Sequence, residues 1–154
     1  MGCDIHCYVE KRTSAGWVQV QIKPDPMDVR SYGIFGFLAG VRNYSDVPPL
    51  AAPRGLPADM SFGVRREYEG WRDDAHTPSW LSMEELMAFN YSAQVEDRRC
   101  TRRVAGGYMS GAETCAPGEG EQMPWSEFLG DWFMDELKRL KDAGAERLVF
   151  WFDN

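Results

Sequence analysis

The chain has 154 residues and a formal net charge of −7, which disfavours nonspecific binding to nucleic acid or to an anionic membrane surface. Hydrophobic residues make up 44% and aromatic residues 13%, too large a share for a disordered chain. The length fits one domain, residues 1–154, with a core of its own.

The composition also bears on where the protein works. No basic segment followed by an apolar one opens the chain, and no apolar run approaches the ~20 residues that span a membrane. The chain has four cysteines, at uneven spacing and without an export signal, which is typical of reduced thiols. We therefore expect a cytoplasmic protein without a membrane partner.

The first ten residues predict a β-strand. Apolar and polar side chains alternate, one face being Cys3, Ile5, Cys7 and Val9 and the other Asp4, His6, Tyr8 and Glu10. A second alternating strand is expected over residues 17–22, joined to the first by a polar turn to form a hairpin. Pro24 and Pro26 then break the sheet.

The middle of the chain predicts helices separated by a long loop. Apolar spacing favours helices over residues 28–41 and 59–71, with a loop rich in proline and glycine over 44–57. Gly36 and its neighbouring glycines weaken the first helix and suggest close approach to another backbone. Residues 72–80 are expected to be extended, because Pro78 disfavours helix before it.

A third helix has a strong start signal at Ser82. Glu85 completes a capping box with Ser82, and Leu81 and Leu86 occupy the positions of a hydrophobic staple. This helix is expected to continue to about residue 93.

The last third of the chain predicts one more helix and a buried strand. Residues 97–120 suggest a short strand at 101–104 and then a loop, and 126–142 predict an amphipathic helix that stops at Gly144. Residues 147–153 carry bulky side chains on both faces, as expected of a strand inside a sheet. The fold class is therefore α+β: a small mixed or antiparallel sheet with the N-terminal hairpin and C-terminal strand as neighbours, and three to four helices packed on it.

Both histidines of the chain follow an aspartate by two residues, giving the pairs Asp4–His6 and Asp74–His76. In extended backbone each pair projects to one side, where it can supply ligands to a divalent metal ion or form a carboxylate-oriented imidazole for acid–base chemistry. We predict Asp4, His6 and Asp153 as metal ligands, and His76, oriented by Asp74, as the catalytic acid–base. The alternative is that both pairs are local structural hydrogen bonds.

Four further residues are predicted to bind substrate. Arg42, Asn43 and Arg54 are candidates for gripping an anionic group, and Trp80 for stacking on a ring. The arginines at 98–103 are interpreted as ordinary surface charge. Cys3 and Cys7 are expected to point away from His6 and to pack in the core, so a zinc site on these thiols is not favoured.

Five motifs together resemble a family of small uncharacterised proteins from bacteriophages and bacterial genomes. They are Met-Gly-Cys-Asp-Ile-His at the start, Leu-Ala-Gly-Val-Arg-Asn at 38–43, Pro-Arg-Gly-Leu-Pro at 53–57, His-Thr-Pro-Ser-Trp-Leu at 76–81 and Val-Phe-Trp-Phe-Asp-Asn at the end. The resemblance implies a phage or prophage setting, hence the cytoplasm of a host cell, and no settled activity. Thr-Pro stands at 77–78 where relatives are expected to carry a further histidine, which weakens a metal site.

These observations lead to three functional hypotheses. The first is a small metal-dependent hydrolase acting on an anionic small molecule, such as a nucleotide or phosphoester, in which the ion lowers the pKa of bound water. The second is a phage protein that sequesters a nucleotide-type signal without turnover. The third is a protein–protein inhibitor with an acidic working surface.

Overall fold

The computed structural model describes residues 2–154, with the backbone alone described at 101–104 and 107–112. Its centre is an antiparallel sheet with strand order β2-β1-β8-β3. These strands are β1 (Asp4–Thr13), β2 (Gly16–Val20), β8 (Arg147–Asp153) and β3 (His76–Ser82). The predicted α+β class is confirmed, with the N-terminal hairpin directly beside the C-terminal strand.

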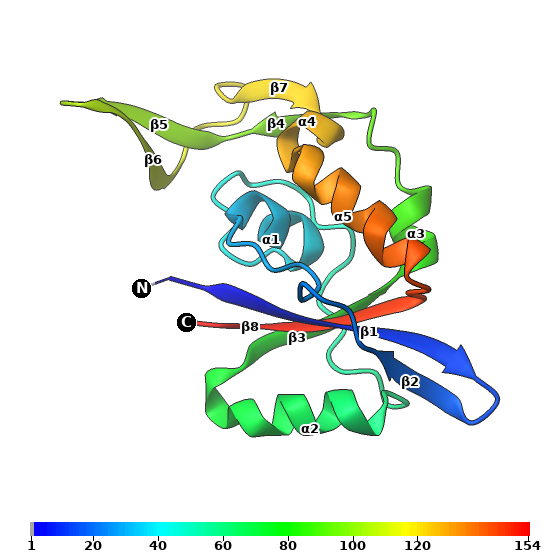
Figure 1. Ribbon diagram of the computed structural model, residues 1–154. Helices are drawn as coiled ribbons and strands as arrows, with labels where there is room; N and C mark the ends of the chain where they lie inside the picture. The colour runs from blue at the N-terminus through cyan, green and yellow to red at the C-terminus, as the bar shows by residue number, and fades with distance from the viewer. Residues whose placement is uncertain (1) are drawn as a thin grey trace.

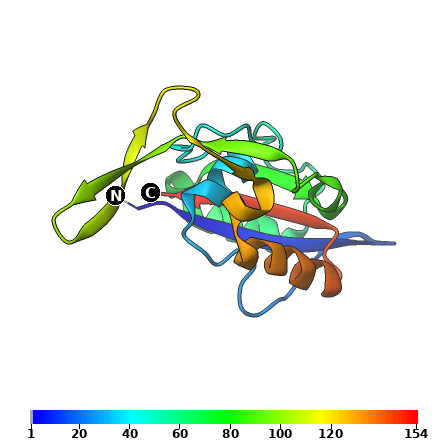
Figure 2. The ribbon, with the colours of Figure 1, turned by 90° about the horizontal axis from the view of Figure 1, so that it is seen from above.

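Helices cover both faces of the sheet (Figures 1 and 2). One face carries α1 (Tyr32–Ala39), α3 (Met83–Ala88), α4 (Trp125–Leu129) and α5 (Asp131–Asp142). The other face carries α2 (Phe62–Trp71), which is followed by the short 3-10 helix η1 (Arg72–Asp74). Two smaller pairs complete the structure: β4 (Gln94–Asp97) with β7 (Glu121–Pro124), and β5 (Arg99–Val104) with β6 (Gly107–Thr114).

Strand β8 forms the centre of the core, as its two-sided hydrophobicity predicts. Every residue of β8 except Asp153 is buried. Phe150 and Phe152 belong to the large cluster under α1 and α5, whereas Val149 and Trp151 belong to the smaller cluster under α2. Because β8 is paired on both edges, its backbone groups are satisfied while both faces stay apolar.

A buried ion pair fixes the register of β1 on β8 (the alignment of the two strands). Arg147 donates to Glu10 Oε1 from Nε at 2.9 Å and from Nη2 at 2.6 Å, and both side chains are buried. The second oxygen of Glu10 accepts the N–H of Ser61 at 2.6 Å, just before α2. This network therefore ties β1, β8 and the start of α2 together.

Several predicted elements have different bounds. The helix predicted over 28–41 begins only at Tyr32, because Ser31 caps it by accepting the N–H of Ile34. The helix predicted over 126–142 is broken at Gly130, which has φ 86° and ψ 162°. The helix after Ser82 has the predicted capping box but ends at Ala88 rather than near 93.

Two other predictions are wrong. Residues 97–120 are not mainly loop but contain β5 and β6, which pair with one another. No local sequence pattern predicts this pairing. Gly36 approaches a side chain rather than a backbone, since a Cβ on Gly36 would lie 2.6 Å from Oδ1 of Asn43.

Candidate functional site

The two chain termini bring an imidazole and a carboxylate together at one end of the sheet. In the register of β1 on β8, Asp4 lies opposite Asp153, and His6 lies opposite Trp151. His6 Nε2 and Asp153 Oδ2 are 3.0 Å apart, and the main-chain N–H of Asp4 donates to Asp153 Oδ1 at 3.1 Å. Both carboxylate oxygens of Asp153 are thus bonded, Oδ1 to the main chain of Asp4 and Oδ2 to the imidazole of His6.

The imidazole ring is also held by an aromatic neighbour. Trp71, the last residue of α2, lies over His6 with ring centroids 3.9 Å apart and an interplanar angle of 36°. The side chains of His6 and Asp153 are each 22% exposed, so the pair is partly buried yet open to small molecules. Within residues 2–154, His6 Nδ1 has no hydrogen-bond partner among the described side chains and backbone.

This arrangement suits acid–base chemistry. A carboxylate that accepts from Nε2 keeps the proton on that nitrogen and leaves the lone pair of Nδ1 free.

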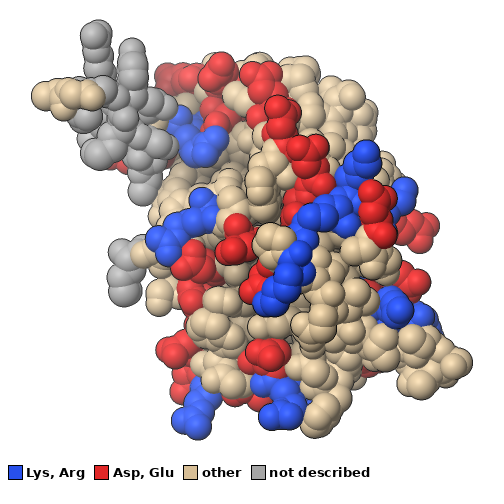
Figure 3. All heavy atoms as spheres, viewed as in Figure 1, with Lys and Arg blue, Asp and Glu red and all other residues tan. Residues whose placement is uncertain are grey.

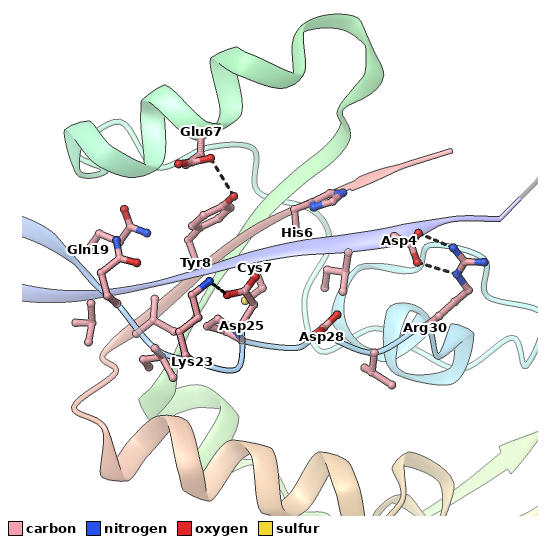
Figure 4. Close-up of a pocket in the computed structure, with 17 residues that line it drawn as sticks. Asp4, His6, Cys7, Tyr8, Gln19, Lys23, Asp25, Asp28, Arg30 and Glu67 are labelled. Carbon is pink, nitrogen blue, oxygen red and sulfur yellow. Dashed lines mark hydrogen bonds and ion pairs between the residues drawn. The ribbon is translucent and has the colours of Figure 1, made fainter.

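The third predicted metal ligand, Asp4, is engaged by an arginine (Figure 4). Arg30 donates to both oxygens of Asp4, from Nε at 2.7 Å and from Nη2 at 2.5 Å, and this pairing lowers the pKa of the Asp4 carboxyl below its usual value. Asp4, His6 and Asp153 therefore lie together but bind each other and Arg30. Among the described residues, no group of three or more His, Cys, Asp or Glu side chains is arranged to hold a metal ion.

The structure does not bring His6 and His76 together. His76 pairs with Phe152 across the two strands, and the centroids of their stacked rings are 6.1 Å apart. Since Phe152 belongs to the cluster under α1, His76 lies on the α1 face of the sheet rather than on the α2 face. Thr77 Oγ1, not Asp74, lies 3.0 Å from His76 Nδ1, and Asp74 is exposed in η1. A register shift after His76, with Thr77 at φ 49°, fixes this orientation.

The predicted substrate-binding residues are divided between two places. Arg42 lies beside the C-terminal residue, because its Nη2 donates to Asn154 Oδ1 at 2.9 Å. The neighbouring Asn43 closes its own loop by donating to the carbonyl of Val47 at 2.7 Å and accepting its N–H at 3.1 Å. The polar atoms of Asn43 are thus already used within the fold.

Arg54 and Trp80 form a separate cluster. Arg54 pairs with both oxygens of Glu85, at 2.6 and 2.8 Å, and its guanidinium lies 4.6 Å from the ring centre of Trp80. Trp80 pairs with Val149 in the sheet, toward the end marked by Arg147. This cluster joins the 44–57 loop to β3 and the start of α3, so its interactions are those of a structural support.

Cys3 and Cys7 lie on the core face, as predicted. Burial raises the pKa of both thiols, although the hydrogen bond from Arg42 partly opposes the effect at Cys3. Both are therefore protonated at neutral pH, which does not favour a thiolate nucleophile or a thiolate metal ligand at this end of the sheet.

Sequence patterns missed Arg30 and Trp71. Arg30 falls within the helix predicted over 28–41 and Trp71 ends the helix predicted over 59–71, so neither residue stands out from its local pattern. Gly2 lies beside this arginine, and a Cβ there would stand 2.7 Å from Arg30 Nη1. The glycine makes room for the arginine that pairs with Asp4.

No protein-family model, curated protein or solved structure matches this chain. None of the helices in the described part of the chain is both long and apolar enough to cross a bilayer. On the face seen in Figure 3, acidic and basic side chains intermingle rather than forming a broad patch of one sign.

Proposed function

We propose that the protein is a hydrolase for a small anionic molecule, such as a nucleotide or phosphoester, with His6 as its acid–base group and Asp153 as the orienting carboxylate. The observation that carries the proposal is the placement of Asp153 between the Asp4 N–H and His6 Nε2, with Nδ1 left open. The His6 side chain is 22% exposed and lines the pocket beside β1, which gives a small molecule access to the ring.

In the proposed reaction, His6 Nδ1 takes a proton from water as the water oxygen attacks the phosphorus or carbonyl centre. The same nitrogen then gives that proton to the leaving oxygen, so the imidazole returns to its starting state. Asp153 stabilises the intermediate imidazolium, and Trp71 restricts the ring to one orientation. General acid–base catalysis of this kind typically contributes about 10²- to 10⁴-fold to the rate.

Arginines at the same end of the sheet support an anionic substrate. The Arg30 side chain is 57% exposed and uses Nε and Nη2 on Asp4, which leaves Nη1 for a ligand. Arg42 lies next to the C-terminal residue, Asn154. A planar guanidinium is well suited to phosphate or carboxylate oxygens.

The divalent metal ion predicted from Asp4, His6 and Asp153 belongs to this proposal as a variant. It requires Arg30 to leave Asp4 and the His6–Asp153 hydrogen bond to open, so that these oxygens and the imidazole nitrogen face one centre. A bound ion would polarise the scissile bond and activate water. Elemental analysis of the purified protein, with and without chelator treatment, tests this variant directly.

The experiment follows both imidazole rings by nitrogen NMR, since the chain has only two histidines and their signals can be told apart. In the wild type we expect His6 in the Nε2–H form. In Asp153→Asn the amide NH₂ can donate to Nε2, so the ring should change to the Nδ1–H form, whereas the His76 signals serve as the internal control.

Turnover is measured on p-nitrophenyl phosphate and on a panel of nucleoside phosphates. His6→Gln and Asp153→Asn should each lose about 10²-fold or more in rate, with melting temperatures close to wild type. Turnover that survives in a folded His6→Gln variant refutes the proposal. A nucleotide that co-purifies and is recovered unchanged would instead support sequestration.

A further inference from the structure

Strand β1 has an edge that is only half covered. It pairs with β8 along Asp4–Glu10, but with β2 only from Val9 to Thr13. Over residues 4–8 the outer edge therefore faces no strand of the described sheet. Main-chain N–H and C=O groups on such an edge are a template for a further strand.

The edge is open because the chain after β2 is held elsewhere. Pro24 and Pro26 take residues 21–30 out of the sheet, and no backbone hydrogen bond joins this segment to residues 4–8. Met27 instead donates its N–H to the buried Glu136 of α5 at 3.0 Å, and Arg139 of α5 donates to the carbonyl of Pro24 at 3.1 Å. The separation between the segment and β1 is thus fixed by the fold.

A groove of about 700 Å³ lies between this edge and the segment (Figure 4). It is lined by β1 from Asp4 to Val9, by residues within 19–30 and by Glu67 of α2. The open edge of five residues is about 13 Å long at roughly 3.3 Å per residue, enough for a short extended peptide. A rigid groove of this kind lowers the entropic cost of ordering a bound chain.

The charges along the groove select the kind of peptide. Lys23 pairs with Asp25 and Arg30 pairs with Asp4. Glu67 only accepts the hydroxyl of Tyr8, and Asp28 is exposed; neither has a cationic partner among the described residues. Glu67 lies on one side of β1 and Asp28 on the other, so cations on both faces of a bound strand would be matched (Figure 4).

We infer that the open edge of β1 is a docking site for an extended, positively charged peptide segment of a partner protein. The peptide adds to β1 as a further strand, since main-chain hydrogen bonds provide affinity in this mode and side chains provide selectivity. Lysine or arginine residues an odd number of positions apart point to opposite faces and meet Asp28 and Glu67. The groove also contains His6 and Arg30 of the proposed catalytic site, so a bound peptide would compete there with an anionic substrate. Peptide binding is therefore measured without substrate and does not depend on turnover at His6.

The probe is the capped peptide Ac-Thr-Lys-Val-Thr-Lys-Val-NH₂, titrated by calorimetry and by amide hydrogen exchange. We expect saturable binding and slower exchange at those amides of residues 5–8 that point away from β8. The same peptide N-methylated on alternate residues keeps its charge but cannot pair, and it should not bind measurably. A version with glutamate in place of lysine should also fail.

Asp28→Asn should weaken binding about two- to fivefold, the range of an exposed ion pair. Asp135→Asn is the matched control, because Asp135 is exposed on α5 away from the groove. Equal binding of the N-methylated peptide or of spermidine would reduce the site to charge attraction and overturn the inference. So would unchanged exchange at residues 5–8 with millimolar peptide, or protection that depends only on protein concentration, which indicates a second copy of this chain.

Discussion

The buried ion pair that sets the register of β1 on β8 offers a quantitative test of the fold beneath the site. Glu10 is completely buried and Arg147 is 4% exposed, so replacing Glu10 by Gln leaves a guanidinium in the interior without its main counter-charge. Breaking a buried pair from one side costs about 3–5 kcal/mol. At about 2–4 °C per kcal/mol for a chain of this size, the melting temperature should fall by roughly 6–20 °C.

The same arginine provides an internal comparison. Arg147 Nη1 also donates to Asp59 Oδ1 at 2.8 Å, but the Asp59 side chain is 62% exposed. Asp59→Asn should therefore cost only about 0–1 kcal/mol, as is usual for exposed pairs. Glutamine at position 10 has one acceptor oxygen, so it loses the hydrogen bond to Ser61 or to Arg147 together with the charge, and the difference between the two variants measures both losses.

The assay is urea unfolding followed by tryptophan fluorescence and circular dichroism, with the melting temperature as a second readout. The double variant Glu10→Leu/Arg147→Met removes both charges and should be more stable than Glu10→Gln alone. The reasoning is refuted if Asp59→Asn costs as much as Glu10→Gln, or if the double variant is the least stable of the three.

Three further predictions concern individual positions. Thr77 has φ 49°, a strained conformation for a β-branched residue, so Thr77→Gly should raise the free energy of unfolding by about 1 kcal/mol in urea; a decrease would mean that its hydrogen bond outweighs the strain. Gly36→Ala should destabilise by about 1–3 kcal/mol because the new Cβ meets Asn43, and Gly36→Ala/Asn43→Ala should cost less than the sum of the two single variants. The hydrogen bonds from Arg54 lower the pKa of Glu85, so the stability they give is complete above the usual carboxyl pKa and is lost as pH falls through the lowered value. Urea midpoints should therefore converge between wild type and Glu85→Gln on acidification, and a constant difference down to pH 3 would contradict this.

Local patterns predicted the parts of the fold that depend on neighbours in sequence. Alternation placed Cys3 and Cys7 on the core face of β1 and His6 on the other, because side chains on a strand change sides at every residue. The capping box at Ser82 is a contact over three residues and was found for the same reason. Helix lengths were less well predicted. A single residue sets each bound: Ser31 caps the start of α1, and the backbone conformation of Gly130 separates α4 from α5.

The candidate site, in contrast, depends on residues that are far apart in sequence. The chain itself determined that an imidazole and a carboxylate would stand near its two ends, on strands with a defined inward face. Only the tertiary structure decided which groups meet: Asp153 comes to His6 across 147 positions of sequence, and Arg30 takes Asp4. It also turned His76 to the opposite face through a single residue with positive φ. Strand register and bulges are set by the packing of the whole core, so a spacing of two residues foretells a shared side only while the backbone stays regular.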